Sequence, residues 1–308
     1  MLIKVIKNEK EGCQVDGFIN LLKPPGMTSH DAVGYVRRQL GEKKIGHAGT
    51  LDPGAAGVLP IAVGKATRLI EYLDGVEKAY RAELLFGYAT DSGDDSGQVL
   101  EQADSFVMPT KEKLLEAFQH FTGSITQIPP AHSAIKINGR RACDLLREGQ
   151  KVDIPARQVQ IHGIKLMHIG QRHIVFDVEC SKGTYIRSLC TDLGSWLGIP
   201  ATMSFLVRRG VGKFALENTV SVEELAELKA EALLPTDGYL EHIMAYDLPE
   251  DRLKAFTNGL LTHDRQFIAR YQATENVPLR VYCQDNFVGM GHFDVSQQAI
   301  LPDKVIIR

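Results

Sequence analysis

The stretch from Gly46 to Gly57, GHAGTLDPGAAG, constrains the fold of this chain more than any other segment. It places four glycines around a single carboxylate, Asp52. Because glycine adopts backbone angles closed to other residues, such a stretch makes tight turns and lets a backbone or a ligand approach closely. Asp-Pro favours a turn, and Pro53 fixes its own φ. The segment therefore predicts a stiff turn in which Asp52 is either a structural turn cap or a functional carboxylate.

Familiar sequence patterns for phosphate, metal and redox sites are absent from this chain. Gly64-Lys65 is followed by Ala66, and the position five before Gly64 is Leu59, so the pattern G-x4-GK[ST] is not met. The histidines show no H-x3-H spacing and the cysteines form no CxxC pair. We therefore expect no cofactor and no metal ligands.

Length and composition indicate an ordinary globular protein of two domains. The chain has 308 residues, of which 44% are hydrophobic and 24% charged. It has no apolar run of about 18 residues, and its charged N-terminus lacks the apolar core of a signal peptide. Five widely separated cysteines are typical of reduced thiols. We expect a cytoplasmic protein with no membrane partner.

Charge is unevenly distributed along the chain. Residues 1–214 carry 27 Lys and Arg against 23 Asp and Glu, whereas residues 215–308 carry 8 against 15. The net charge of −3 argues against a nucleic-acid binder, but local clusters matter more than totals. The larger, mildly basic part leaves room for a basic groove, and the tail is acidic.

Hydrophobic periodicity predicts both helices and strands before residue 250. The pattern predicts strands at 15–22, 78–86 and 173–180, and residues 58–63 suit a short buried segment. Helical spacing predicts helices that begin after Thr28, at 111, after Gly183 and after Ser221. Thr28 with Asp31, and Ser221 with Glu224, form capping-box patterns. These elements indicate an α+β protein.

The end of the chain has a different pattern. Short strand-like runs separated by turn signals occupy residues 265–270, 278–283, 286–293 and 304–308. This pattern predicts a small, mostly β domain. We divide the chain into a large domain, residues 1–248, and a terminal domain, residues 249–308.

Several segments resemble one enzyme family. Residues 47–53 (HAGTLDP), continuing through Gly57 and Leu59 to GKATR at 64–68, resemble the catalytic motif of TruB-type tRNA pseudouridine synthases. Other segments resemble further motifs of that family, in the same order: KPPGMTS at 23–29, Lys78 to Tyr80, PP with SAIK and GR between 129 and 140, CSKGTYIRSL at 180–189 and LVRR at 206–209. The resemblance covers about residues 15–235, and the last 60 residues resemble a PUA-like RNA-binding domain. His132 and Cys143 stand where the family usually has tyrosine.

The resemblance implies both a fold and a reaction. The fold is a pseudouridine synthase catalytic domain, with a mixed, mostly antiparallel sheet and flanking helices, followed by a small β-rich PUA-like domain. The reaction is the isomerisation of uridine 55 in the T loop of tRNA to pseudouridine, which consumes no cofactor. The implied partner is tRNA, with no required protein partner and a monomeric enzyme.

The resemblance also assigns catalytic roles to three residues. Asp52 is the catalytic carboxylate, and Arg187 keeps it ionised by lowering its pKa. Tyr80 supplies a wall for the flipped base and a candidate hydroxyl for removing the C5 proton. From pattern alone, Tyr80 is instead the first core residue of a strand, and Arg187 a solvated helix residue.

The remaining matched positions are implied to contact the substrate. Tyr185 lines the same pocket, and His47 helps to evict the base or contacts the RNA backbone. The matched basic residues add salt-dependent affinity for phosphates; they are Lys23, Arg68, Lys136 and Lys182.

Three other functions stay open on the sequence. One is an RNA-guided pseudouridine synthase subunit, although the chain lacks a long Lys-rich tail. Another is a tRNA-folding chaperone that binds the elbow without catalysis. The third is a nucleoside glycosidase that uses one carboxylate and releases free uracil.

Overall fold

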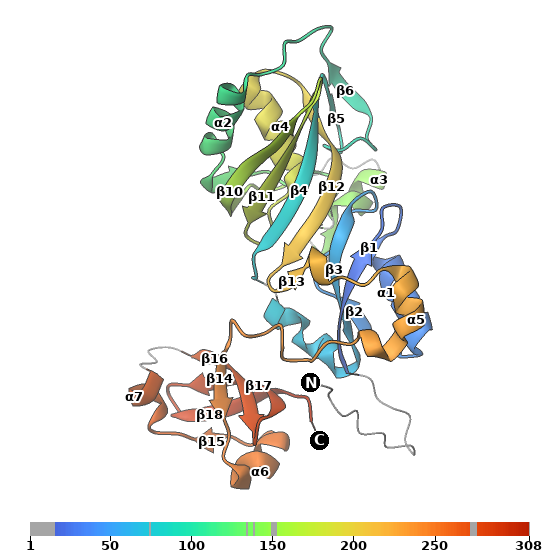
Figure 1. The fold of residues 1–308 in the computed structure, drawn as a ribbon. Coiled ribbons are helices and arrows are strands. Elements are labelled where there is room, and N and C mark those ends of the chain that lie inside the picture. The colour runs from blue at the N-terminus through green and yellow to red at the C-terminus, as the bar shows by residue number, and fades with distance from the viewer. Residues whose placement is uncertain are drawn as a thin grey trace.

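A long sheet and a smaller second sheet form the framework of the molecule (Figure 1). The computed structural model describes residues 16–307 apart from 74, 134, 138, 149–152 and 272–275. The strands of the long sheet are β1 (Gly17–Lys23), β2 (Ile45–His47), β3 (Ala56–Val63), β4 (Lys78–Phe86), β7 (Gly123–Gln127), β10 (Arg157–Ile169), β11 (His173–Cys180), β12 (Ala201–Val211) and β13 (Phe214–Ala215). The second sheet contains β14 (Met244–Asp247), β15 (Thr262–His263), β16 (Val277–Cys283), β17 (Asn286–Asp294) and β18 (Ala299–Val305).

Two hairpins and several helices complete the described part of the chain. The hairpins are β5 (Tyr88–Thr90) with β6 (Val99–Gln102), and β8 (Lys136–Ile137) with β9 (Arg140–Arg141). The α-helices are α1 (Ser29–Leu40), α2 (Lys111–His120), α3 (Ala142–Arg147), α4 (Ile186–Leu197), α5 (Val222–Leu228), α6 (Leu253–Thr257) and α7 (Phe267–Tyr271). The 3₁₀-helices are η1 (Gly64–Leu73), η2 (Leu216–Asn218), η3 (Lys229–Ala232) and η4 (Glu250–Arg252).

The long sheet is mixed and mostly antiparallel, as expected. Its order is β1-β3-β12-β4-β11-β10-β7, with β2 added beside β3 and β13 beside β12. Only the short β3–β12 pairing is parallel among these described strands. With helices on the sheet and between its strands in sequence, the fold is α+β, and the prediction is confirmed.

The parallel pairing brings two motifs of the sequence into contact. Gly57 of β3 pairs with Arg208 of β12. A Cβ on Gly57 would lie 2.2 Å from the backbone oxygen of Arg208, and Gly57 has a φ of +112°. This position therefore requires glycine, both for its backbone angle and for the close approach of the neighbouring strand.

Local signals place the helix that precedes the Asp52 turn. The Thr28 hydroxyl accepts from the Asp31 amide at 3.0 Å, and the Asp31 carboxylate accepts from the Thr28 amide at 3.1 Å. Gly41, in the left-handed conformation, ends α1. The same reciprocal capping by Ser221 and Glu224 begins α5. Both predicted capping boxes are confirmed.

Helices cover the sheet in two groups. In the upper half of Figure 1, α2 and α4 pack on β4, β10, β11 and β12, around a core that includes Phe86, Phe118, Phe176 and Leu193. In the lower half, α1 and α5 pack beside β1 and β3. The site described below lies between these halves, where β3 and β12 meet.

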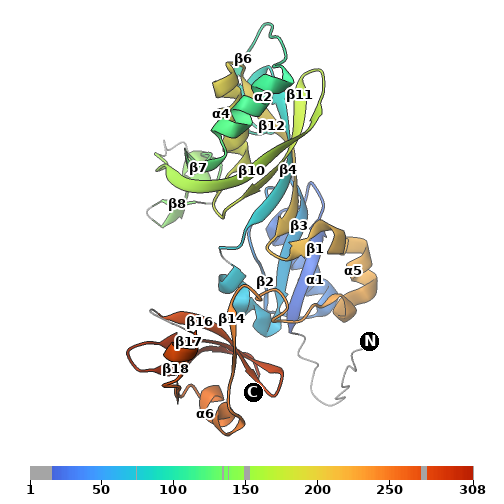
Figure 2. The same ribbon diagram turned by 60° about the vertical axis from the view of Figure 1, so that its left-hand side comes forward.

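The second sheet has the order β14-β16-β17-β18-β15 and lies beside η1 in both ribbon views (Figures 1 and 2). Leu69 and Leu73 of η1 share a hydrophobic cluster with Met290 and Ile306. This apolar contact joins the terminal sheet to the larger part of the molecule.

Two predicted terminal strands differ from the structure. Residues 265–270 were expected as a strand, but Phe267–Tyr271 form α7, because Asp264 accepts from the Gln266 amide and Phe267 stacks on Phe293 at 4.2 Å. The last strand runs from Ala299 to Val305 rather than over residues 304–308. Tertiary packing of one aromatic side chain overrides the local β pattern in the first case.

The acidic tail predicted from the sequence is a narrower segment than residues 215–308. Residues 249–308 carry seven basic and seven acidic side chains, so the excess lies in residues 215–248. That segment includes α5 and η3, which pack beside α1. The terminal domain, residues 249–308, is therefore neutral by this count, and the acidity of the tail belongs to the segment before it.

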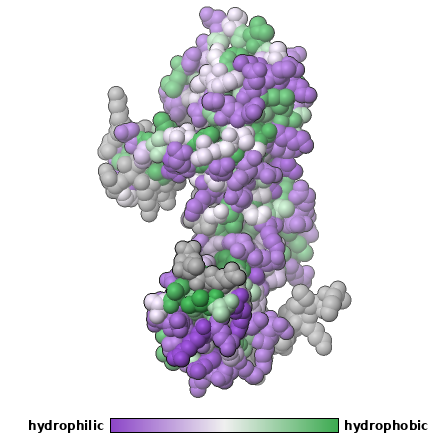
Figure 3. All heavy atoms as spheres, turned by 90° about the vertical axis from the view of Figure 1, so that its left-hand side faces the viewer, coloured by the Kyte–Doolittle hydropathy of each residue, from purple (hydrophilic) through white to green (hydrophobic). Residues whose placement is uncertain are grey.

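The surface is mainly hydrophilic on the face shown in Figure 3, with hydrophobic side chains in small patches. Among the residues that the structure describes, no helix combines the length and apolar character needed to cross a membrane.

Candidate active site

Asp52 lies in the turn between β2 and β3, and hydrogen bonds from Gly26 and Ser29 hold this turn in place. The Ser29 hydroxyl donates to the Leu51 carbonyl at 3.1 Å and accepts from the Leu51 amide at 2.9 Å. The Pro53 carbonyl accepts from the Gly26 amide at 2.8 Å. The backbone on both sides of Asp52 is thus fixed by the segment that leads into α1.

Arg187, in the first turn of α4, faces Asp52. Its Nε lies 3.0 Å from Asp52 Oδ2, and its Nη1 lies 3.5 Å from Asp94 Oδ2. Nη1 also donates to the Ser92 carbonyl at 3.0 Å, and Nη2 to the His132 carbonyl at 3.1 Å. Since its side chain is only 5% exposed, the reading of Arg187 as a solvated helix residue is wrong.

Asp94 is a member of this site that the sequence analysis missed. It belongs to the loop between β5 and β6, where its Oδ1 accepts from the Ser92 hydroxyl at 2.7 Å and the Ser96 amide at 3.1 Å. Its other oxygen faces Arg187. The available signal was the acidic, Gly/Ser-rich composition of residues 90–97, which alone does not say what the loop approaches.

The environment raises the pKa of the Asp52 carboxyl. Partial burial is the main cause; Arg187 and Lys23 oppose it, and Asp94 adds to it. The Asp52 side chain is 39% exposed, so the carboxylate remains open to the pocket. The expected pKa-lowering effect of Arg187 is present, but burial outweighs it.

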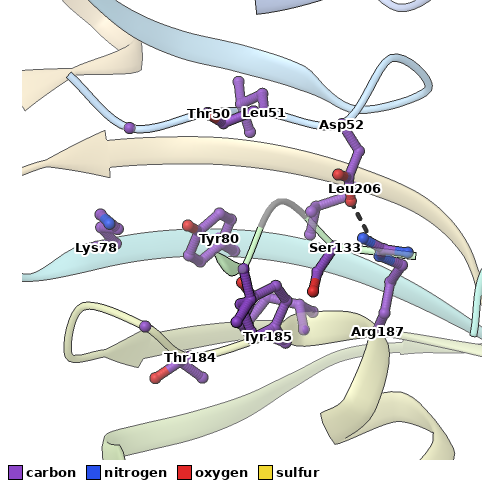
Figure 4. Close-up of a pocket in the computed structure, with 14 residues that line it drawn as sticks. Thr50, Leu51, Asp52, Lys78, Tyr80, Ser133, Thr184, Tyr185, Arg187 and Leu206 are labelled. Carbon is purple, nitrogen blue, oxygen red and sulfur yellow. Dashed lines mark ion pairs between the residues drawn. The ribbon is translucent and has the colours of Figure 1, made fainter. Parts of the chain in front are cut away.

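Aromatic and aliphatic side chains wall the pocket beside this ion pair. The pocket encloses about 310 Å³, and its lining includes Tyr80 of β4, Tyr185 at the start of α4 and Leu206 of β12. Asp52 and Arg187 face each other at one end of it, and Lys78 lies at the other (Figure 4). Burial raises the pKa of the Tyr80 phenol, so this group stays protonated at neutral pH.

Tyr185 is held at the pocket by its backbone. Its amide donates to Gln127 Oε1 at 2.7 Å, and Gln127 Nε2 donates to its carbonyl at 3.0 Å. The guanidinium of Arg157 lies 5.6 Å from the centre of the Tyr185 ring. These contacts hold the Tyr185 backbone in place, and the Tyr185 side chain is half-buried at the edge of the pocket.

Lys23 does not lie where the predicted phosphate contact requires. Its side chain is fully buried, and its Nζ donates to the carbonyls of Pro24 at 2.9 Å, Met27 at 2.7 Å and Pro53 at 3.3 Å. Burial lowers the pKa of this amine to about 8. The geometry makes Lys23 a support beneath the Asp52 turn.

The other predicted substrate contacts are spread over the surface around the site. Lys182 is exposed and borders a second hollow with Lys78 and Arg157, next to the pocket. Arg68 lies apart from both, where its Nη1 donates to the Val305 carbonyl at 2.8 Å.

His47, on β2, is half-buried, and its Nδ1 is buried without a hydrogen-bond partner among the described residues. Burial lowers the pKa of its imidazole. The side chains of Lys136 and Cys143 lie outside the described part of the chain. In that described part, no three His, Cys, Asp or Glu side chains are grouped to hold a metal ion.

Comparisons with known proteins point to one family. Residues 37–186 match the model of the TruB family pseudouridylate synthase N-terminal domain, and residues 187–245 match that of the tRNA pseudouridylate synthase B C-terminal domain. The tRNA pseudouridine synthase B of Clostridioides difficile is 44% identical over 281 residues, which cover 89% of this chain and 93% of that protein. The protein of the same name from Symbiobacterium thermophilum is 51% identical over 225 residues, 72% of this chain and 75% of that protein.

The fold also resembles a solved structure. A chain of a Cbf5-Nop10-Gar1 complex is 27% identical with a TM-score of 0.72, and the match covers 96% of this chain and 85% of that one.

Proposed function

Since the chain belongs to the TruB family of pseudouridylate synthases, we propose that it isomerises uridine 55 in the T loop of tRNA to pseudouridine. We further propose that Asp52 is the reacting carboxylate. The observation that supports this most is the 3.0 Å ion pair between Asp52 and the buried Arg187, at one end of a pocket walled by Tyr80 and Tyr185.

The proposed reaction exchanges one bond of the nucleoside for another. The C1′–N1 glycosidic bond breaks, the uracil turns, and a C1′–C5 bond forms. The proton on C5 then leaves, and N1 gains one. Because the product has the same atoms as the substrate, no cofactor and no second substrate are consumed.

Asp52 acts in its ionised form in this proposal. Attack on C1′, addition to the base and abstraction of a ribose proton all begin with the carboxylate. Arg187 stabilises that form, whereas partial burial and Asp94 disfavour it. The reaction rate should therefore fall as acid protonates Asp52. This fall should occur at a pH higher than the ordinary pKa of an aspartate.

The pocket walls suit a base that has left its stack. A uridine inside a folded loop must be flipped out before a side chain can reach it, and a flipped base needs apolar or aromatic walls. Tyr80, Tyr185 and Leu206 are such walls. The Tyr80 hydroxyl lies in the same pocket and is the candidate group for the C5 proton. This role requires the phenol to be ionised, which burial opposes by raising its pKa and the positive charge of Arg208 favours.

Features near the pocket support tRNA as the partner. Lys78, Arg157 and Lys182 border the adjacent hollow, where phosphates would add salt-dependent affinity. We include residues 249–308 in the proposal as a PUA-like RNA-binding domain. The relatives at 44% and 51% identity are each named tRNA pseudouridine synthase B, which favours an enzyme that works alone over a guided subunit. A cytoplasmic location is part of the same proposal.

Pseudouridine mapping on an unmodified tRNA transcript tests the proposal. The purified protein alone should produce one pseudouridine, at position 55, and Asp52→Asn should produce none while it still binds tRNA. Leu115→Ala is a matched control, because Leu115 lies on the outer side of α2 with 46% of its surface exposed.

Each alternative function predicts another result. Free uracil would indicate a glycosidase. Unmodified tRNA that is bound and refolded equally by both proteins would indicate a chaperone, and modification that requires added guide RNA would indicate a guided subunit.

A further inference from the structure

Among the residues that the structure describes, Arg208 is the largest fully buried side chain, with 1% of its surface exposed. It lies on β12, two residues after Leu206, which lines the pocket. Among the residues that the structure describes, no carboxylate lies within ion-pair distance of its guanidinium. A buried cation without a carboxylate partner stabilises a fold poorly, so its burial needs another explanation.

Three hydrogen bonds of the Arg208 side chain go to the segment that carries Asp52. Nη2 donates to the Gly49 carbonyl at 3.0 Å and Nη1 to the Thr50 carbonyl at 3.2 Å, just before the Asp52 turn. Nε donates to the Val58 carbonyl at 2.7 Å, just after it. One rigid, planar group thus spans both ends of the turn.

The same side chain lies beside Tyr80. Arg208 and Tyr80 are directly paired on β12 and β4, so their side chains share one face of the sheet. The positive charge of Arg208 opposes the rise that burial causes in the pKa of Tyr80. Arg208 therefore contacts the Asp52 turn on one side and the phenol on the other.

We propose that Arg208 is a positioning residue, which holds the Asp52 turn and the Tyr80 ring at a fixed separation across the pocket. Arg208 is not among the residues that line the pocket, so it acts through the lining residues that it holds. This inference rests on the proposed function for its kinetic consequence, but the restraint on the turn is a property of the folded chain itself.

The first test replaces Arg208 with lysine, which keeps the charge but cannot span three carbonyls. In single-turnover reactions, Arg208→Lys should lower the rate about 100-fold, because an error of about 1 Å in a reacting group has a cost of that order. Its Kd for tRNA should stay within about twofold of wild type, since the side chain is buried away from RNA. Equal rates, or a loss confined to Kd, would overturn the proposal.

Arg209→Lys is the matched control. Arg209 is the next residue on β12 but lies on the other face, where its Nη1 is 2.7 Å from Asp177 Oδ2. We expect its single-turnover rate to be unchanged. A comparable loss in both variants would mean that β12 simply tolerates no change, and would also contradict the positioning role.

A double-mutant cycle with Tyr80→Phe separates positioning from general damage. If Arg208 acts partly through the Tyr80 hydroxyl, Arg208→Lys should slow the Tyr80→Phe enzyme clearly less than it slows wild type. Fully additive losses would refute this part of the role.

Hydrogen exchange tests the restraint without any activity. In Arg208→Lys, amides of residues 48–55 should exchange faster, whereas those of β10 and β11 should not. Unchanged hydrogen exchange in residues 48–55 would overturn the proposal even if the single-turnover rate fell. If wild type makes no pseudouridine, the proposed function fails, and the exchange measurement still decides whether Arg208 holds the turn.

Discussion

Replacing Gly57 with alanine tests how the β3–β12 junction supports the site. The new Cβ would lie 2.2 Å from the backbone oxygen and 2.7 Å from the backbone nitrogen of Arg208. These are backbone atoms of a central strand, so no side chain can rotate to make room. The two strands must separate, and Arg208 must move with β12.

Two effects contribute to the expected loss of stability. Alanine at the observed φ of +112° costs about 1–2 kcal/mol through local strain. Separating the strands weakens several backbone hydrogen bonds, worth about 1 kcal/mol each. We expect a total loss of about 3–5 kcal/mol in the free energy of unfolding, in the range reserved for specific packing defects.

Urea denaturation of the purified variant measures this loss, and Gly54→Ala is its control. Gly54 lies three residues earlier, in the Asp52 turn, but a Cβ there would meet no atom within 4 Å and its φ is not positive. We expect the control to change stability by less than about 0.5 kcal/mol. If the two variants differ by less than about 1 kcal/mol, the close approach of the strands is not what this position requires.

Three further substitutions concern charged side chains, two in the site and one farther along α4. Arg187→Lys removes the planar fork that spans four acceptors, and single-turnover kinetics should show a loss of about 100-fold or more with tRNA binding retained. Asp94→Asn removes a charge that raises the pKa of Asp52, so the acid limb of the pH–rate profile should move to lower pH; a limb that stays in place would contradict this electrostatic role. Asp192, on α4, has a pKa raised by burial to about 6 from 3.8. Because its folded pKa exceeds the unfolded one, Asp192 destabilises the fold above pH 6, and this penalty disappears as the pH falls towards 4. Asp192→Asn should therefore be about 1 kcal/mol more stable at pH 7.5, after allowance for partial solvent exposure, and equal to wild type near pH 4 in thermal or urea denaturation.

Local sequence was sufficient to predict several elements because their signals lie within a few residues. Thr28 with Asp31 predicted the start of α1. Strict alternation predicted β4 and β11. Capping and alternation are properties of neighbouring residues, so tertiary contacts reinforce them rather than decide them.

Other elements could not be predicted, because packing partners far away in the chain decide them. The longest strand, β10, has two register irregularities and many exposed positions, which break the alternation that identifies a strand. The segment of α7 has a strand-like composition, but Phe267 becomes helical where it reaches the core of the terminal sheet. In both cases the sequence of the segment does not show which distant residues it packs against.

The sequence by itself determined the Asp52 turn, through its glycines and its Asp-Pro pair, and the resemblance indicated which residues lie with it in the site. Only the tertiary structure decided that Asp94 approaches Arg187, that Lys23 is buried beneath the turn and that Arg208 bonds to its carbonyls. The physical reason is that a carboxylate, an ammonium and a guanidinium look alike in sequence whether they are solvated or buried. Their roles here depend on partners 30 to 159 residues away, which only the folded sheet brings together.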